Sequence, residues 1–163
     1  HTEVHARETA RVLKAINPAH VRLRTLWVYA GSPLDAMRQN GAFEQLDEED
    51  IVREIQRMLR GMNGIDGRVV SDHDLNLIGN IEGHITHDFE RLDRLCQRFL
   101  DLEPEMRDAF VTARRSGYFR SLSAFLNEPD AVPTFGPLGK ELRKLGDGSL
   151  VKGIAIRMDR RTI

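Results

Sequence analysis

The hydrophobic and polar positions of the chain predict a mixture of helices and short strands in its first 80 residues. A helical pattern comes first and stops at Asn17-Pro18. Residues 21–28 alternate at first and then become continuously apolar, which is typical of a strand that becomes buried in a parallel sheet. A turn at residues 31–34 leads into a short helix that closes near Gly41.

A long amphipathic helix is expected next, followed by a second strand around Arg68 to Ser71. Asp47 can cap this helix, acidic residues at 48–50 suit its positive end, and Asn63-Gly64 ends it. Its apolar stripe should face the core and comprises Ile51, Ile55, Met58, Leu59 and Met62. The spacing of the two strands suits a parallel βαβ unit, so both strands should end at the same edge of the sheet.

Beyond Asn76 the pattern is mainly helical. We expect one helix that is capped by Thr86, a second that begins at Pro104, and a third that is capped by Ser121. A last helix is expected over 138–145. Proline and glycine indicate a loop over 127–139, and residues 150–158 suit a short terminal strand. We expect this α/β chain to divide into three parts. They are an α/β part over residues 1–80, a helical extension over 81–126, and a final loop, short helix and strand over 127–163.

Composition narrows the class of protein. The chain has 163 residues, which is one domain in length, and its 24 basic and 25 acidic residues nearly cancel. No net field would therefore steer it to nucleic acid or to a membrane surface. No run reaches the roughly 20 apolar residues that span a bilayer, and no signal peptide opens the chain, so we expect a cytoplasmic protein. The single Cys96 lies on an apolar helix face and should be buried.

The second strand ends in a cluster of polar residues. Ser71, Asp72, His73 and Asn76 follow an apolar run, and polar residues at the carboxyl ends of strands commonly line sites in α/β proteins. His73 could exchange a proton near neutral pH, and the other three could contact a substrate or cofactor. The alternative is that these residues only satisfy backbone groups in a turn.

Several short motifs occur in an order that resembles part of a radical S-adenosylmethionine (radical SAM) domain. The chain is similar to the later part of such a domain in the group of coproporphyrinogen-oxidase-like iron–sulfur oxidoreductases, over roughly its first 125 residues. The motifs are His5-Ala6, Glu8 to Leu13, Ile16-Asn17-Pro18, Val21 to Leu26, Gly31-Ser32-Pro33-Leu34, Gly41-Ala42-Phe43, the helix from Glu49, Val70-Ser71-Asp72-His73 with Asn76, and Arg114-Arg115-Ser116-Gly117-Tyr118. Ala30 departs from the pattern, because a proline commonly precedes the Gly-Ser/Thr-Pro-Leu turn.

The resemblance implies a partial (β/α) barrel in which a [4Fe-4S] cluster cleaves S-adenosylmethionine. The cluster is held by a Cys-x3-Cys-x2-Cys loop early in the domain, and one cysteine cannot supply those ligands. We therefore expect a carboxy-terminal fragment of a parent enzyme that acts on a small molecule, with this chain inactive alone. The cluster loop would belong to the amino-terminal part of the parent, and the open edge of a truncated barrel would favour self-association.

The resemblance also implies which residues lie near the cofactor. Trp27, Tyr29, Gly31 and Ser32 would belong to a late barrel strand and its turn, where the adenine and methionine groups rest. The alternative for the aromatic residues is packing in a buried strand.

Two other interpretations remain open. The set of His84, His87 and Asp88 could hold a divalent metal in a His-Asp phosphohydrolase-like site together with His73, Asp72 and Asp74, although positions 84 and 87 straddle a helix start. The helix-rich second half could instead be a non-catalytic interaction module, which exposed Phe or Leu residues after Gly117 would favour.

Overall fold

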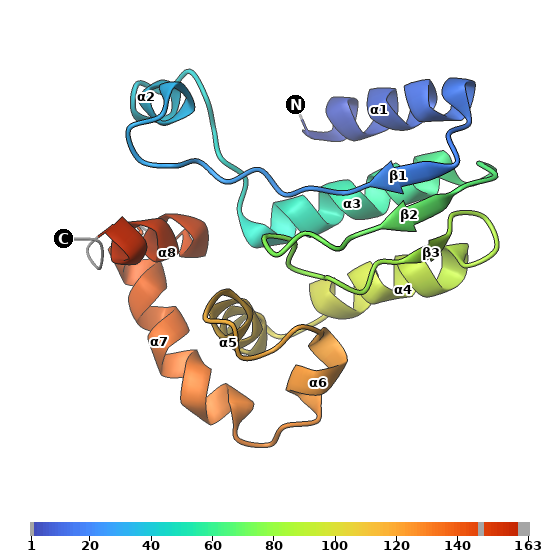
Figure 1. The fold of residues 1–163 in the computed structure, drawn as a ribbon. Coiled ribbons are helices and arrows are strands. Elements are labelled where there is room, and N and C mark those ends of the chain that lie inside the picture. Colours follow the sequence, from blue (N-terminus) through green and yellow to red (C-terminus); the bar gives the residue numbers. More distant parts are fainter. Residues whose placement is uncertain (1, 147–148, 160–163) are drawn as a thin grey trace.

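A computed structural model describes residues 2–146 and 149–159, and it combines helices with one small sheet (Figure 1). The sheet has three strands, in the order β1 (His20–Arg22), β2 (Arg68–Val70) and β3 (Gly83–His84). β1 and β2 are parallel, with His20 opposite Arg68, and β3 runs antiparallel to β2. The predicted parallel βαβ unit is therefore confirmed, and both parallel strands end at one edge of the sheet.

Three helices pack together beside this sheet: α1 (Thr2–Ile16), α3 (Glu48–Met62) and α4 (Phe89–Leu100) (Figure 1). α1 and α3 approach closely because each presents a small residue at the contact. A Cβ atom added to Gly61 would lie 2.6 Å from the Cβ of Ala10. Val69 and Leu59 are buried in the core below them, together with Met62. Cys96 of α4 is buried as predicted, and burial raises the pKa of its thiol to about 12.

Four further helices follow α4 in the chain and form a second group (Figure 1). They are α5 (Pro104–Arg115), α6 (Leu122–Leu126), α7 (Ala131–Leu145) and α8 (Leu150–Asp159). Phe110 lies at the centre of their aromatic core, with edge contacts to Phe99 and Phe125 at centroid separations of 6.0 and 5.4 Å. The helical extension therefore packs into the main hydrophobic core.

Two predictions for the end of the chain were wrong. The predicted loop over 127–139 belongs largely to α7, and the predicted terminal strand over 150–158 lies in α8. Pro133 is in the first turn of α7, where a missing N–H breaks no helical hydrogen bond. The glycines of α7 serve close packing: a Cβ on Gly139 would lie 3.1 Å from the hydroxyl of Thr112 on α5. Tertiary packing thus outweighs the local breaker signal.

Local signals elsewhere gave mixed results. Ser121 caps α6 through its side chain and α5 begins at Pro104, both as predicted. Ser32, in the predicted turn, caps α2 (Pro33–Gln39) through its side chain. Thr86 caps no helix, because α4 begins at Phe89 and the hydroxyl of Thr86 instead donates to the carbonyl of Ile65 at 2.9 Å. The predicted strand over 21–28 pairs with β2 only as far as Leu23, whose N–H donates to the carbonyl of Val70 at 2.9 Å.

The predicted cap of α3 also has a different role. Asp47 stands at the cap position but makes no side-chain cap hydrogen bond there. Its Oδ1 accepts from the hydroxyl of Ser149 and the backbone N–H of Val151, at 3.2 and 3.3 Å. Asp47 therefore fastens the start of α8 to the start of α3. No described helix combines the length and apolar character needed to cross a membrane.

Candidate functional site

The polar residues that follow β2 fold back into a tight loop, and two of them meet in its buried interior. The hydroxyl of Ser71 donates to the carbonyl of Ile78 at 3.0 Å. The amide Nδ2 of Asn76 donates to the Ser71 hydroxyl at 2.9 Å. Ser71 and Asn76 are both buried, so their side chains form the internal frame of the loop.

Asn76 also ties the loop to the chain that continues from β1. Its Nδ2 donates to the carbonyl of Leu23 at 2.9 Å, and its Oδ1 accepts from the N–H and the hydroxyl of Thr25 at 2.8 and 3.0 Å. The N–H of Leu23 still donates to the carbonyl of Val70 at 2.9 Å, and beyond it the Asn76 carboxamide supplies partners to the carbonyl of Leu23 and the N–H of Thr25. Asn76 thus holds the chain that continues from β1 beside the loop.

Asp72 lies on the outer side of the loop and pairs with Arg22 of β1. The Nε and Nη2 of Arg22 donate to the two carboxylate oxygens at 2.7 and 2.6 Å. This bidentate contact lowers the pKa of Asp72 below its ordinary value. Both side chains are exposed to solvent, so Asp72 stays accessible to a ligand as a carboxylate.

His73 carries an unpartnered nitrogen in this loop. Its Nδ1 is buried and has no hydrogen-bond partner among the described residues. A buried polar atom without a partner is uncommon, so this nitrogen has a hydrogen-bonding capacity that water or a ligand can use. The predicted proton-exchange role of His73 stays a prediction, and this nitrogen is the atom that could perform it.

Two consecutive arginines of α5 hold the loop from the side of the helical extension. Nη2 of Arg114 donates to the carbonyls of Asp74 and Asn76 at 3.0 and 2.9 Å. Nη1 of Arg115 donates to the carbonyl between them, that of Leu75, at 2.6 Å. Three successive carbonyls are therefore fixed by two side chains that are 38 to 40 residues away in sequence.

Arg115 makes two further contacts that extend the frame. Its Nε and Nη2 donate to Oε1 of Glu48 at 2.8 and 2.6 Å, and its guanidinium lies 5.7 Å from the ring centroid of Trp27. The other oxygen of Glu48 is buried without a partner among the described residues. Burial raises the pKa of Glu48, although the positive charge of Arg115 opposes this shift.

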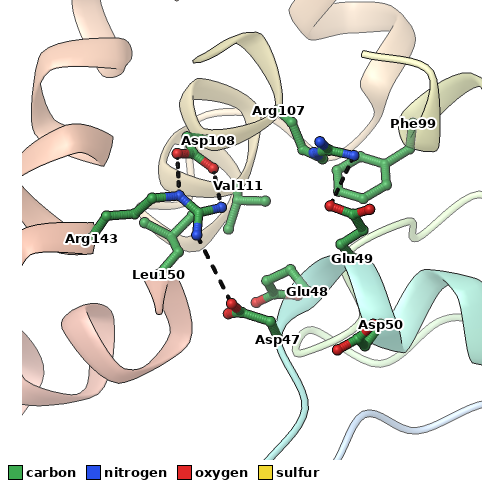
Figure 2. Close-up of a pocket in the computed structure, with 10 residues that line it drawn as sticks. All are labelled: Asp47, Glu48, Glu49, Asp50, Phe99, Arg107, Asp108, Val111, Arg143 and Leu150. Atoms are coloured by element: carbon green, nitrogen blue, oxygen red, sulfur yellow. Dashed lines mark hydrogen bonds and ion pairs between the residues drawn. The ribbon is translucent and has the colours of Figure 1, made fainter. Parts of the chain in front are cut away.

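The start of α3 carries two further ion pairs to the helical extension (Figure 2). Glu49 pairs with Arg107 of α5 at 3.0 Å, and Asp47 pairs with Arg143 of α7 at 3.9 Å. Arg143 also pairs with Asp108 and so joins α7 to α5. These charged side chains surround a small hollow of about 280 Å³. The acidic first turn of α3, expected only to suit the helix dipole, is thus the surface on which α5 and α7 dock.

The structure separates the four predicted cofactor neighbours into two groups. Trp27 lies under Arg115, the arginine that also holds the carbonyl of Leu75. Trp27 is therefore part of the set of residues that surround the loop after β2. Gly31 adopts φ +75° in the turn, and Ser32 caps α2 by accepting from the N–H of Asp35 at 3.1 Å. Tyr29 is exposed. Among the described residues, no hydrogen bond, ion pair or ring contact joins Tyr29, Gly31 or Ser32 to residues 71–76.

The histidines of the metal-site interpretation are engaged with each other. The rings of His84 and His87 stack with centroids 4.0 Å apart. Nε2 of His84 contacts Asp66 at 3.0 Å, and its Nδ1 accepts from the N–H of His87 at 3.2 Å. Within residues 2–146 and 149–159, no group of three or more His, Cys, Asp or Glu residues could hold a metal ion.

Sequence reasoning missed four residues that hold the loop after β2 in place, directly or through Arg115: Thr25, Glu48, Arg114 and Arg115. The arginines belong to one of the motifs of the radical SAM resemblance, but nothing in their local pattern indicated their partners. Comparison of the chain with protein-family models, with curated proteins and with solved structures found no match.

Proposed function

We propose that this chain is the carboxy-terminal part of a radical SAM, [4Fe-4S]-dependent oxidoreductase and forms one wall of its cofactor site. One observation carries the proposal. The motif Arg114-Arg115, in the helical extension, contacts the carbonyls of the motif that ends in Asn76, far away in sequence. This contact supports the proposal because it brings together two of the motifs that carry the resemblance.

The parallel strand pair also supports the proposal. The carboxyl ends of β1 and β2 are tied together by Asn76, and sites in α/β barrels are built at the carboxyl ends of their strands. The residues that we propose to face the cofactor there are Trp27 and His73, with Asp72 at the rim. Tyr29, Gly31 and Ser32 are more distant and belong to the loop that leads to α2. They would contact the cofactor from that loop.

The described residues do not fit the iron–sulfur cluster itself. Cluster irons need several thiolate ligands. Cys96 is the only cysteine of the chain, and it is buried in the core with a raised pKa. The proposal therefore assigns the cluster to the amino-terminal part of the parent enzyme and expects this chain alone to be inactive. The substrate of the parent is not assigned.

The coding sequence upstream of His1 tests the proposal directly. We expect it to encode Cys-x3-Cys-x2-Cys on a loop after a first strand. The longer product, reconstituted with iron and sulfide without oxygen, should then hold about four irons per chain. An initiator methionine within a few residues of His1, or a longer product that binds no iron, would contradict the proposal.

A further inference from the structure

A second hollow lies between α1, α3 and the two segments that lead to and from α2. It reaches the strand-end loop, which is the loop over residues 71–78 after β2, only at Asn76. Its volume is about 780 Å³, and its lining shares only Asn76 with the predicted site residues. Small-molecule sites commonly have volumes of roughly 300–1,000 Å³. The hollow is therefore large enough for a small organic ligand.

The inner wall of this hollow is apolar. Three of the five residues in the predicted core stripe of α3 line it, namely Ile51, Ile55 and Met58, whereas Leu59 and Met62 farther along the same stripe are fully buried. The first three side chains are only partly buried. Leu26, which lines the same hollow, is exposed. Apolar surface of this kind gains free energy when a ligand removes it from water.

The polar groups deeper in the wall are already satisfied. Asn76 and Thr25 bond to each other there, and nearer the solvent the exposed His5 contacts Glu54. A ligand therefore meets no demand for a hydrogen bond in the interior. Recognition inside the hollow depends on the fit of an apolar body.

The opening has an excess of negative charge. Glu44 and Asp50 border it, and within the described part of the chain neither carboxylate has a hydrogen-bond or ion-pair partner. Arg24 is the one guanidinium in the lining. The unpaired carboxylates outnumber it, so a cationic group at the opening is favoured over an anionic one.

We propose that this hollow binds an amphipathic small molecule, with its apolar body against Ile51, Ile55 and Met58 and an amine beside Glu44 and Asp50. The site would share Leu23, Thr25 and Asn76 with the proposed cofactor wall, but binding in the hollow would not depend on a cofactor. A loss of radical SAM activity in the parent would therefore leave this proposal unchanged.

Three matched probes test the proposal on the full chain: 4-phenylbutylamine, 4-phenylbutanol and 4-phenylbutyrate. Methyl NMR should show saturable shifts of Ile51, Ile55 and Met58, with the amine bound about two- to fivefold tighter than the alcohol. The acid should bind most weakly. No saturable shift with any probe, or tighter binding of the acid than of the amine, would overturn the proposal.

Variants separate the apolar wall from the charged opening. Ile55→Trp should fill the hollow and abolish binding of all three probes, whereas Arg57→Trp, at an exposed position of the same helix outside the hollow, should leave binding unchanged. The double change Glu44→Gln with Asp50→Asn alters only exposed side chains, so it should preserve the fold and remove the preference for the amine. A preference that survives this double change would contradict the role assigned to the two carboxylates.

Discussion

Arg115 places two hydrogen bonds on one oxygen of Glu48, at 2.8 and 2.6 Å, and so joins α5 to the start of α3. The side chains are only 8% and 4% exposed. Removing one partner of such a pair leaves an uncompensated charge in a place that water does not reach. The same guanidinium also holds Leu75 and covers Trp27, so this contact links the helical extension to the strand-end loop.

Arg115→Met should lower the free energy of unfolding by about 3–5 kcal/mol, because it leaves Glu48 and the carbonyl of Leu75 without their partner. Urea unfolding followed by circular dichroism measures this loss. Arg94→Met is the matched control, since Arg94 is 71% exposed and its pair with Glu90 should contribute less than about 1 kcal/mol. Equal effects of the two changes would contradict the assigned role of Arg115.

Glu48 should make stability fall as pH rises. Its pKa in the folded chain is raised above the ordinary value of 4.5. Its contribution is therefore complete below pH 4.5 and is lost as pH rises through the folded pKa. Glu48→Gln removes this titration, so the variant should gain stability relative to the unchanged chain as pH rises above 4.5. Urea unfolding at a series of pH values measures the difference, and a difference that stays constant with pH would refute it.

Asn76→Ala should release the two strand ends from each other. The change leaves the buried carbonyl of Leu23 and the N–H of Thr25 unpaired, at a cost of about 2–4 kcal/mol. Hydrogen exchange should show lost protection of the Thr25 amide. Asn76→Asp is the matched comparison, because it retains an acceptor for Thr25 and should preserve more of that protection. If the Thr25 amide stays protected in both variants, Asn76 does not hold this segment.

Self-association is expected for this chain at high concentration. β1 lies at one edge of the sheet, and α1 exposes Val4, Val12 and Ile16 on its outer side. An open strand edge beside exposed apolar side chains favours contact between copies. Light scattering should show an oligomer, and Val12→Glu should weaken it. A folded monomer at high concentration would contradict this prediction.

Parts of the fold could be predicted because their signals are local. The turn at residues 31–34 leads into α2, Pro104 marks the start of α5, and the spacing of the two strands favours a parallel crossover. The apolar stripe of α3 was also recognisable, although the hollow beside Ile51 and Ile55 was not. A periodicity shows which side of a helix is apolar, but it does not show how completely that side is covered.

The rest depended on contacts between distant residues. α7 forms across two prolines and two glycines because the glycines allow it to pack closely on α5. Thr86 resembles a helix cap but bonds to Ile65 instead. Neither partner is visible in the local sequence. The Phe and Leu residues after Gly117 are another example: none is exposed within the described residues, so the feature that would favour an interaction module is not found there.

The most direct test of the proposed function is the formation of 5′-deoxyadenosine by the longer gene product. With its cluster reconstituted and reduced by dithionite, that product should cleave S-adenosylmethionine, and Cys96→Ser should cleave it equally well because Cys96 holds no iron. Activity should fall at least about tenfold in His73→Ala if this residue contacts the cofactor or substrate. Absence of 5′-deoxyadenosine from a product with a full cluster, or its loss in Cys96→Ser, would contradict the account.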